Sequence, residues 1–212
     1  MQKFLPIFPL SLVAYPGEEL NLHIFEPRYK QLITECAGEN KTFGIPVVNK
    51  KEILEYGTEM QLKEIVKTYD NGELDIKVKG LHVFRILDII NEVTDKLYSG
   101  AVVAIINNVN DHHARTFNEL EHRINELFTL LEIKETIFKK SLVFDSFHLA
   151  HLVGFEIMDE FELLKHPRET TRQKIILEHV KKMLPVVKQM AEIREKAKLN
   201  GHFRMVNPPE GL

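Results

Sequence analysis

The stretch "FPLSLVAYPGEELNLHIFEPRYKQLI", residues 8–33, decides the fold of the first half of the chain. Within it, "LNLHIF" at residues 20–25 predicts a strand. Pro27 then suits the first position of a helix, where the missing N–H of proline leaves no hydrogen bond unmade. The helix would end near Gly38, because glycine readily takes the left-handed conformation that follows a helix. One face of this helix is apolar and should be buried: Tyr29, Leu32, Ile33 and Cys36.

The composition is typical of a globular protein. Apolar residues make up 44% of the 212 residues and charged residues 28%, and the net charge of −3 gives no overall attraction to nucleic acid or an anionic membrane. Cys36 is the single cysteine, which excludes an internal disulfide and favours the cytoplasm. Pro6 and Pro9 interrupt the N-terminal apolar run, and no run reaches the roughly 18 apolar residues of a membrane helix. We therefore expect a soluble, cytoplasmic protein without a membrane partner.

The first half of the chain, residues 1–110, has the period of strands. "ELDIKVKG", residues 73–80, alternates apolar and charged residues, which predicts a half-buried strand. Asn71 and Gly72 before it predict a tight turn, with residues 58–69 as the partner strand, bulged between Leu62 and Ile65. Pro6 and Pro46 cannot donate to a ladder, so they indicate edge positions or bulges. The other strands are expected at 3–8, 20–25, 42–48, 82–90 and 98–106.

The second half, residues 111–212, has the period of helices. Apolar residues recur every three or four positions between 117 and 131, which predicts an amphipathic helix. Shorter helices are expected at 135–143, 145–153 and 159–165. A long helix should run from Thr171 to Leu199 with a kink at Pro185, where proline removes a backbone hydrogen bond. The sequence thus predicts an α+β protein with a β-rich domain at 1–110 and a helical domain at 111–212.

Motifs of catalysis and cofactor binding are absent from the sequence. "GENKTFG", residues 38–44, lacks the order of glycines, lysine and hydroxyl that cradles a phosphate. Neither a dinucleotide-binding glycine motif nor a nucleophile elbow occurs. Cys36 lies on the face of its helix expected to be buried, where a free cysteine is usually inert. We therefore expect no enzyme activity and no cofactor.

Histidines supply the one metal-like arrangement. Asp145, His148 and His151 are spaced i, i+3, i+6 on an expected helix, and imidazoles at such a spacing can chelate zinc or iron. No cysteine or further Glu-x-x-His pair completes the set. These three residues are therefore candidates only, and we expect no functional metal.

The end of the chain is basic. Between Lys165 and Lys198 there are ten lysines and arginines against four glutamates. One interpretation is a surface for RNA or an acidic partner, with Lys181, Lys182 and Lys188 as the contacts. The favoured interpretation is a solvated helix face whose charges are partly paired at i, i+4.

Several motifs resemble one known family. They are "FPL" at 8–10, "YPGEELNLHIFEPRY" at 15–29, "FGI" at 43–45, "YGTEMQLKEI" at 56–65 and "GLHVF" at 80–84. Together with the helical half they are similar to the Lon N-terminal domain, the substrate-recognising module of the ATP-dependent protease Lon. The resemblance runs from about residue 4 to 190. The branch that it matches is that of stand-alone bacterial proteins, Lon-domain RING-finger proteins and cereblon.

The resemblance implies a fold. It implies a PUA-like β pseudo-barrel with one short helix, then a helical bundle that ends in a long helix, and it makes "YPG" a turn between strands. Two departures weaken transfer of a ligand site, namely Val83 where the family commonly has arginine and "DNGEL" in the hairpin. The ATPase and Ser–Lys peptidase modules of Lon are not in these 212 residues, so the resemblance transfers neither activity.

The resemblance also implies a function. It indicates a non-catalytic module that binds unfolded or specific client proteins, or that delivers them to a protease or regulates one. Phe25, Tyr29 and Phe43 are the candidate aromatic anchors for clients. RNA binding is the alternative, because PUA-like barrels also occur in RNA-modifying proteins and the last helix is basic. The sequence does not indicate an oligomeric state.

Overall fold

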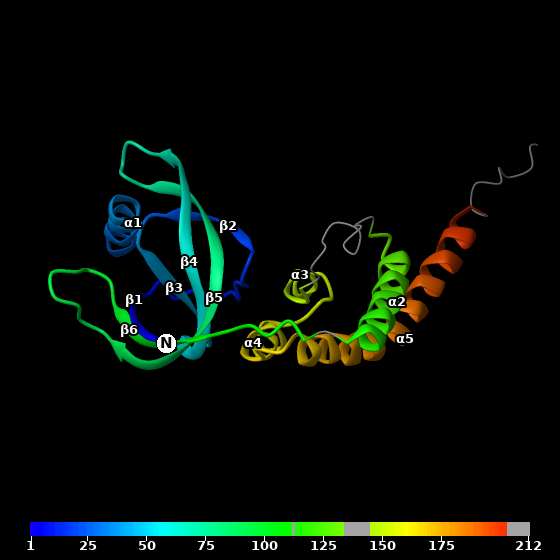
Figure 1. The fold of residues 1–212 in the computed structure, drawn as a ribbon. Helices are drawn as coiled ribbons and strands as arrows, with labels where there is room; N and C mark the ends of the chain where they lie inside the picture. The colour runs from blue at the N-terminus through cyan, green and yellow to red at the C-terminus, as the bar shows by residue number, and fades with distance from the viewer. Residues whose placement is uncertain (112, 134–144, 203–212) are drawn as a thin grey trace, which may run out of the picture. The chain divides into compact units, whose positions relative to one another are not determined.

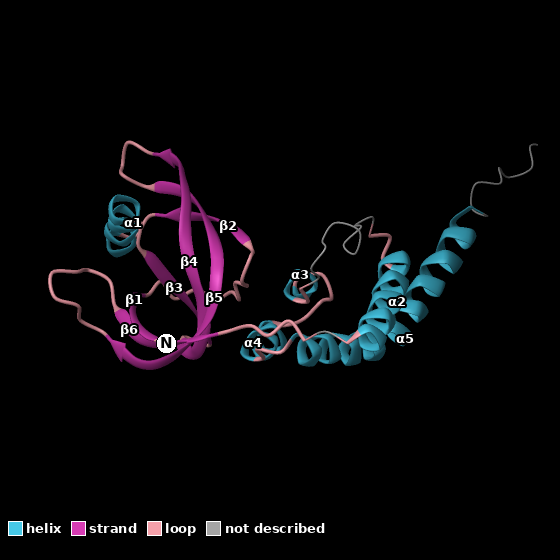
Figure 2. Ribbon diagram, in the orientation of Figure 1, coloured by secondary structure: helices cyan, strands magenta, loops and turns pink. Residues whose placement is uncertain are grey.

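The structure is a computed structural model of the chain, and it describes residues 1–111, 113–133 and 145–202, with side chains as far as residue 198. An antiparallel sheet comes first and helices follow, so the α+β class is confirmed (Figures 1 and 2). The strands are β1 (Gln2–Pro6), β2 (Glu19–Ile24), β3 (Thr42–Asn49), β4 (Glu52–Thr68), β5 (Leu74–Ile90) and β6 (Gly100–Ile106). The helices are α1 (Pro27–Glu39), α2 (Ala114–Leu130), α3 (Phe147–Ala150), α4 (Ile157–Lys165) and α5 (Glu169–His202).

The sheet has the strand order β1-β6-β5-β4-β3, and β2 pairs with β5. The expected hairpin joins β4 to β5, with Gly72 at a φ of +76° in its turn. The expected bulge is confirmed by a register shift between Leu62 and Glu64. Residues 73–80 and 82–90, expected as two strands, form the single strand β5, because the pairing with β4 continues past Gly80 through a further register shift.

The two outer strands of the sheet are linked by the segment that follows β1. Ile7 bridges Gly44 and Leu10 bridges Val47, both in parallel orientation, so this segment lies along β3. The sheet therefore closes on itself here into a barrel-like form. Pro46 lies at a register shift between β3 and β4, as the sequence predicted.

The "YPG" motif forms the turn that leads into β2. Glu18 N–H donates to the Tyr15 carbonyl at 3.2 Å, and Gly17 has a φ of +83°, which is the pattern of a type II turn with proline and glycine at its centre. Gly17 N–H donates to the Gly80 carbonyl, and Gly80 N–H donates to the Glu18 carbonyl, both at 2.9 Å. The turn is thereby fixed to β5.

Helix α1 begins at Pro27 as predicted, but its end differs from the expectation. Gly38 lies inside the helix, and Asn40 is the residue that takes the left-handed conformation, with a φ of +50°. The prediction at Gly38 was wrong because asparagine also tolerates this conformation, so the helix can continue until β3 must begin. The buried face is confirmed: Tyr29, Leu32, Ile33 and Cys36.

The apolar core of the sheet lies between α1 and the inner faces of β2–β5. It includes Ile33, Phe43 and Met60, each completely buried. Burial raises the pKa of the Cys36 thiol to about 11, so this thiol stays protonated at neutral pH and acts as core packing.

The described residues form two compact units. One contains residues 1–111 and 145–172, and the other contains residues 113–133 and 173–202. Packing contacts do not test independent folding, so the domain boundary expected at residue 110 stays a prediction.

The first unit includes α3, α4 and the first turn of α5. The helix expected at 145–153 is shorter than predicted, since α3 spans only Phe147–Ala150, whereas α4 covers the expected 159–165 and two further residues. Tyr15 donates its hydroxyl to the Glu160 carbonyl at 3.1 Å, and its ring stacks on that of Phe147 at 4.9 Å. The helix expected at 135–143 lies outside the described residues.

The second unit consists of α2 and the rest of α5. Ion pairs join Lys181 of α5 to Glu119 of α2 and Lys188 to Glu126. The residue numbers of the partners increase in the same direction along both helices, so the two helices are parallel. Helix α5 is longer than the expected Thr171–Leu199 at both ends and continues through Pro185; a kink there stays a prediction. The buried apolar residues in the described part of this unit are Leu120, Ile124, Leu127, Phe128, Ile176, Leu177, Val180, Leu184 and Val187. No helix in the described part of the chain has both the length and the apolar content that crossing a membrane requires.

Candidate functional site

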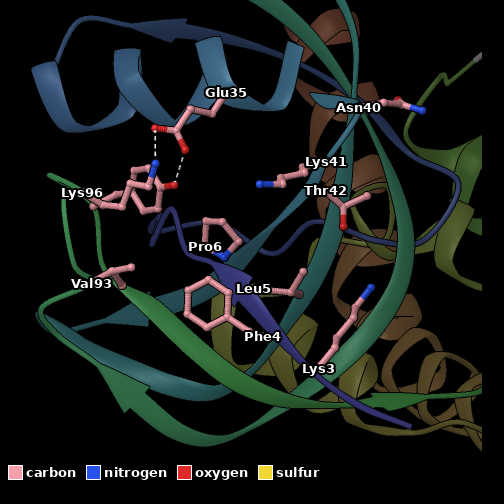
Figure 3. Close-up of a pocket in the computed structure, with 11 residues that line it drawn as sticks. Lys3, Phe4, Leu5, Pro6, Glu35, Asn40, Lys41, Thr42, Val93 and Lys96 are labelled. Atoms are coloured by element: carbon pink, nitrogen blue, oxygen red, sulfur yellow. Dashed lines mark hydrogen bonds and ion pairs between the residues drawn. The ribbon is translucent and has the colours of Figure 1, made fainter. Parts of the chain in front are cut away.

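A pocket of about 440 Å³ opens in the first unit beside β1, the start of β3, the end of α1 and the loop 91–99 (Figure 3). Strand β1 contributes four consecutive residues to it. The lining residues are Lys3, Phe4, Leu5, Pro6, Glu35, Asn40, Lys41, Thr42, Val93, Lys96 and Tyr98.

One wall of the pocket is held by a carboxylate. Glu35 of α1 accepts hydrogen bonds from the Tyr98 hydroxyl at 2.6 Å and from Lys96 Nζ at 2.9 Å (Figure 3). These hydrogen bonds, the one from Tyr98 first, lower the pKa of Glu35. Burial and the same hydrogen bond raise the pKa of Tyr98. The pair therefore fixes α1 to the loop 91–99 and does not supply a general acid near neutral pH.

The lysines of the pocket are paired with carboxylates. Lys3 Nζ lies 2.5 Å from Glu59 Oε1, and Glu59 is only 3% exposed. Burial alone would raise the pKa of Glu59, but the hydrogen bonds from Lys3 and Thr42 outweigh it and lower this pKa. Lys41 forms an ion pair with Glu39 in the same way. Positive charge is thus largely compensated, which does not favour the binding of a free anion.

Phe4 supplies the apolar floor of the pocket. Its side chain is 45% exposed, and its ring lies so close to Gly100 that a Cβ there would be 2.2 Å from a ring atom. The lack of a side chain at Gly100 on β6 therefore lets the ring pack against this strand, while the rest of the ring remains open to solvent. The sequence analysis did not single out Phe4. The signal that could have identified Phe4 is its place on the first strand, where neighbouring residues point to opposite faces. Because Leu5 is buried, the Phe4 ring beside it must lie on the outer face.

The three predicted aromatic anchors lie in different environments. Tyr29 is 5% exposed and Phe43 is fully buried, and both belong to the main core cluster. Phe25, directly after β2, is 58% exposed and its ring faces that of His23. Of the three, Phe25 alone offers surface to a client, and its part in binding stays a prediction.

The candidate metal ligands interact with protein groups. Asp145 caps Phe147 N–H at 3.0 Å and contacts Arg172 at 3.4 Å. His151 lies between two carboxylates, with Nδ1 2.6 Å from Glu160 and Nε2 3.2 Å from Glu18. His148 Nδ1 lies 3.1 Å from the backbone oxygen of Asp145. Within the described residues, no three histidine, cysteine, aspartate or glutamate side chains come together as metal ligands.

The basic residues of α5 face acidic residues of α2. Lys181 Nζ lies 2.9 Å from Glu119, and Lys188 Nζ lies 2.5 Å from Glu126. Lys182 is exposed. Two of the three lysines proposed for RNA are therefore already paired within the protein, with α2 and not at the expected i, i+4 spacing along α5.

These features define an α+β fold in which an antiparallel sheet, closed by parallel pairing, precedes a set of helices. The family model of the ATP-dependent protease La (LON) substrate-binding domain matches residues 4–182. The chain therefore belongs to this family, and the resemblance noted in the sequence is confirmed.

Two solved structures have a similar fold. A Lon N-terminal domain protein from Xanthomonas campestris is 22% identical with a TM-score of 0.65, and the match covers 83% of this chain and 98% of that one. The N-terminal domain of a Lon protease from the Mycobacterium avium complex is 13% identical with a TM-score of 0.63, covering 84% of this chain and 98% of that one. At these identities the likeness concerns the fold alone.

Proposed function

We propose that this chain is a non-catalytic, cytoplasmic module that binds protein clients through exposed apolar segments, and that it either delivers them to a protease or regulates proteolysis. The match of residues 4–182 to a family of substrate-binding domains carries the proposal. Capture of this kind needs no nucleotide or cofactor.

The pocket beside β1 supports the proposal physically. An aromatic ring that is held in place but half-exposed offers apolar contact with little loss of side-chain entropy, since Phe4 is already ordered against Gly100. The lysines of the pocket form ion pairs with Glu59, Glu39 and Glu35. A client would therefore be recognised by apolar and backbone contacts and not by the client's net charge.

The test is a comparison of one protein in two states. Fluorescence anisotropy would measure the affinity for reduced, carboxymethylated lactalbumin, which is permanently unfolded, and for native lactalbumin. We expect binding of the unfolded form only. Absence of binding at concentrations up to about 1 mM, where the binding free energy would be about −4 kcal/mol, would contradict client recognition.

The same assay distinguishes client binding from the alternative function, RNA binding. Replacing Lys181, Lys182 and Lys188 by glutamine should leave the affinity for the unfolded protein unchanged, whereas an RNA-binding function predicts weaker and less salt-dependent binding of a single-stranded RNA. Phe25→Ala tests the predicted anchor, because its affinity falls only if the exposed ring contacts the client.

A further inference from the structure

The parallel pairing that closes the sheet stops at a defined residue. Leu10 N–H donates to the Pro46 carbonyl at 3.2 Å, and Phe8 N–H donates to the Gly44 carbonyl at 2.8 Å. Each step along this ladder moves two residues on both strands, so the next donor would be the N–H of residue 6 and the next acceptor the carbonyl of residue 42. Residue 6 is proline and has no N–H, so the closing ladder cannot continue to Thr42.

On the N-terminal side of Ile7, the edge of β1 that faces away from β6 is not paired with a strand among the described residues. Ile7 N–H donates to the Ser99 carbonyl at 2.9 Å, and the Met1 carbonyl accepts from Ile105 N–H at 3.0 Å, so the backbone groups of these residues, which flank β1, point toward the β6 side. In an antiparallel ladder the backbone groups alternate between the two sides. The N–H and carbonyl of Phe4 therefore point away from β6. Within residues 1–111, the strand pairing gives β1 no partner on this side before Ile7.

The edge of β3 across the pocket is likewise not paired with β1 at Thr42. The Gly44 carbonyl accepts from Phe8, so the backbone groups of Gly44 point away from β4. By the two-residue period of a strand, the N–H and carbonyl of Thr42 point in the same direction. Phe4 and Thr42 both line the pocket of about 440 Å³, and both are drawn in Figure 3. The pocket is thus a gap in the barrel between two strand edges.

We propose that an extended segment of an unfolded protein binds in this gap by adding a strand to the outer edge of β1. Its backbone would pair with the N–H and carbonyl of Phe4, and one of its apolar side chains would lie against the Phe4 ring. Alternating donors and acceptors on a strand edge match an extended polypeptide backbone, and main-chain pairing of this kind is tolerant of client sequence. The inference rests on the proposed function and specifies how a client binds.

Pro6→Ala is the most specific variant, because it supplies the N–H that the closing ladder lacks. The ladder can then extend to the Thr42 carbonyl and close the gap, so we expect binding of the unfolded protein to weaken about tenfold while the fold is kept. Phe4→Ala leaves the backbone unchanged and removes the apolar contact, with a loss of similar size. Leu87→Ala is the matched control, since Leu87 is 47% exposed on β5 and lies outside the pocket.

The backbone pairing is tested with a synthetic probe. The peptide has eight residues of alternating valine and threonine flanked by lysines, and two further versions carry N-methyl groups on one or the other set of alternate residues. Strand addition predicts that binding is lost with at least one methylated version, because that version cannot donate to β1. Retention of binding by both methylated peptides would overturn the proposal.

The two proposals fail in different ways. If carboxymethylated lactalbumin binds the wild type, Pro6→Ala and Phe4→Ala with equal affinity, strand addition at β1 is wrong and the proposed function still stands. If it binds none of them, the proposed function itself is wrong.

Discussion

One ion pair of the first unit and one of the second lie in opposite environments. In the first unit Glu169 and Arg172 are 1% and 2% exposed, whereas in the second the pair of Lys188 and Glu126 lies at the surface. A buried pair must have every polar group satisfied, while an exposed pair exchanges its partners with water. We infer that the first unit adds a fixed polar network to its apolar core, whereas the second unit depends on its apolar contacts.

The network of the first unit is well satisfied. Arg172 Nη2 lies 2.6 Å from Glu169 Oε2, and Arg172 Nε donates to Ser146 Oγ at 3.0 Å. The remaining guanidinium nitrogen donates to the backbone carbonyls of residues 166 and 167, and the group lies 4.0 Å from the centre of the Phe147 ring. The first turn of α5 is thereby fixed to α3.

The largest expected effect comes from breaking this network. Arg172→Ala leaves Glu169 buried without its main cationic partner, so the free energy of unfolding should fall by about 3–5 kcal/mol, as measured by urea denaturation. Replacing both residues by methionine removes both charges together and should cost less than the single change. A loss below about 1 kcal/mol for Arg172→Ala would contradict the comparison, since this is the range of exposed pairs.

In the second unit the largest effect should come from an apolar residue. Leu120 is fully buried, so Leu120→Ala should lower the free energy of unfolding by about 2–5 kcal/mol. Val186→Ala is the control, because Val186 is 53% exposed on α5 and its truncation should change stability by less than about 0.5 kcal/mol. Equal effects of the two substitutions would show that apolar burial does not hold this unit.

An intermediate effect is expected from pH. Hydrogen bonds to Glu160 and then Glu18 raise the pKa of His151 to about 10, above its unfolded value near 6.5. The protonated form is favoured by folding, so the stabilisation is fully present below about pH 6.5 and is lost as the pH rises to about 10. Water screens this half-exposed ring, so the change should be smaller than for Arg172→Ala.

Thermal unfolding across this pH range measures the contribution of His151. The melting temperature of His151→Gln should depend less on pH than that of the wild type. His148→Gln serves as the control, because the His148 ring contacts a backbone oxygen, that of Asp145 at 3.1 Å. An unchanged pH dependence in His151→Gln would contradict the assignment.

The smallest effect is expected from an exposed pair. Lys188→Ala should lower the free energy of unfolding by about 0–1 kcal/mol, although Lys188 Nζ lies 2.5 Å from Glu126. A double-mutant cycle with Glu126→Ala measures the coupling, which should shrink further in about 0.5 M salt. Coupling above about 2 kcal/mol that salt does not change would show that the second unit also relies on a fixed polar contact.

Local features of the sequence predicted local structure well. Pro27 starts α1, Pro16 and Gly17 form the turn before β2, and the hairpin at Gly72 is present, because each depends on backbone preferences of neighbouring residues. The end of α1 was misplaced because Gly38 and Asn40 can both leave a helix. The choice between them depends on where β3 pairs with β4.

The candidate site was less accessible to sequence reasoning. Phe43 and Phe25 are both aromatic residues in or beside predicted strands, yet one is fully buried and the other is 58% exposed. A strand pattern gives two faces but does not say which strands will pair. Likewise, the lysines of α5 are a basic run in sequence, and their pairing with α2 depends on residues more than fifty positions away.

The sequence by itself determined the α+β class, the family, most of the strands and helices, and the limit that Pro6 sets on backbone donation. These follow from short-range periodicity, from turn and cap chemistry, and from the absence of an N–H on proline. Only the tertiary structure decided that Pro6 and Thr42 line the same pocket, that Phe4 lies over Gly100, and that Arg172 is buried with Glu169. The reason is that pairing register and burial are set by contacts between distant segments, which a local pattern does not contain.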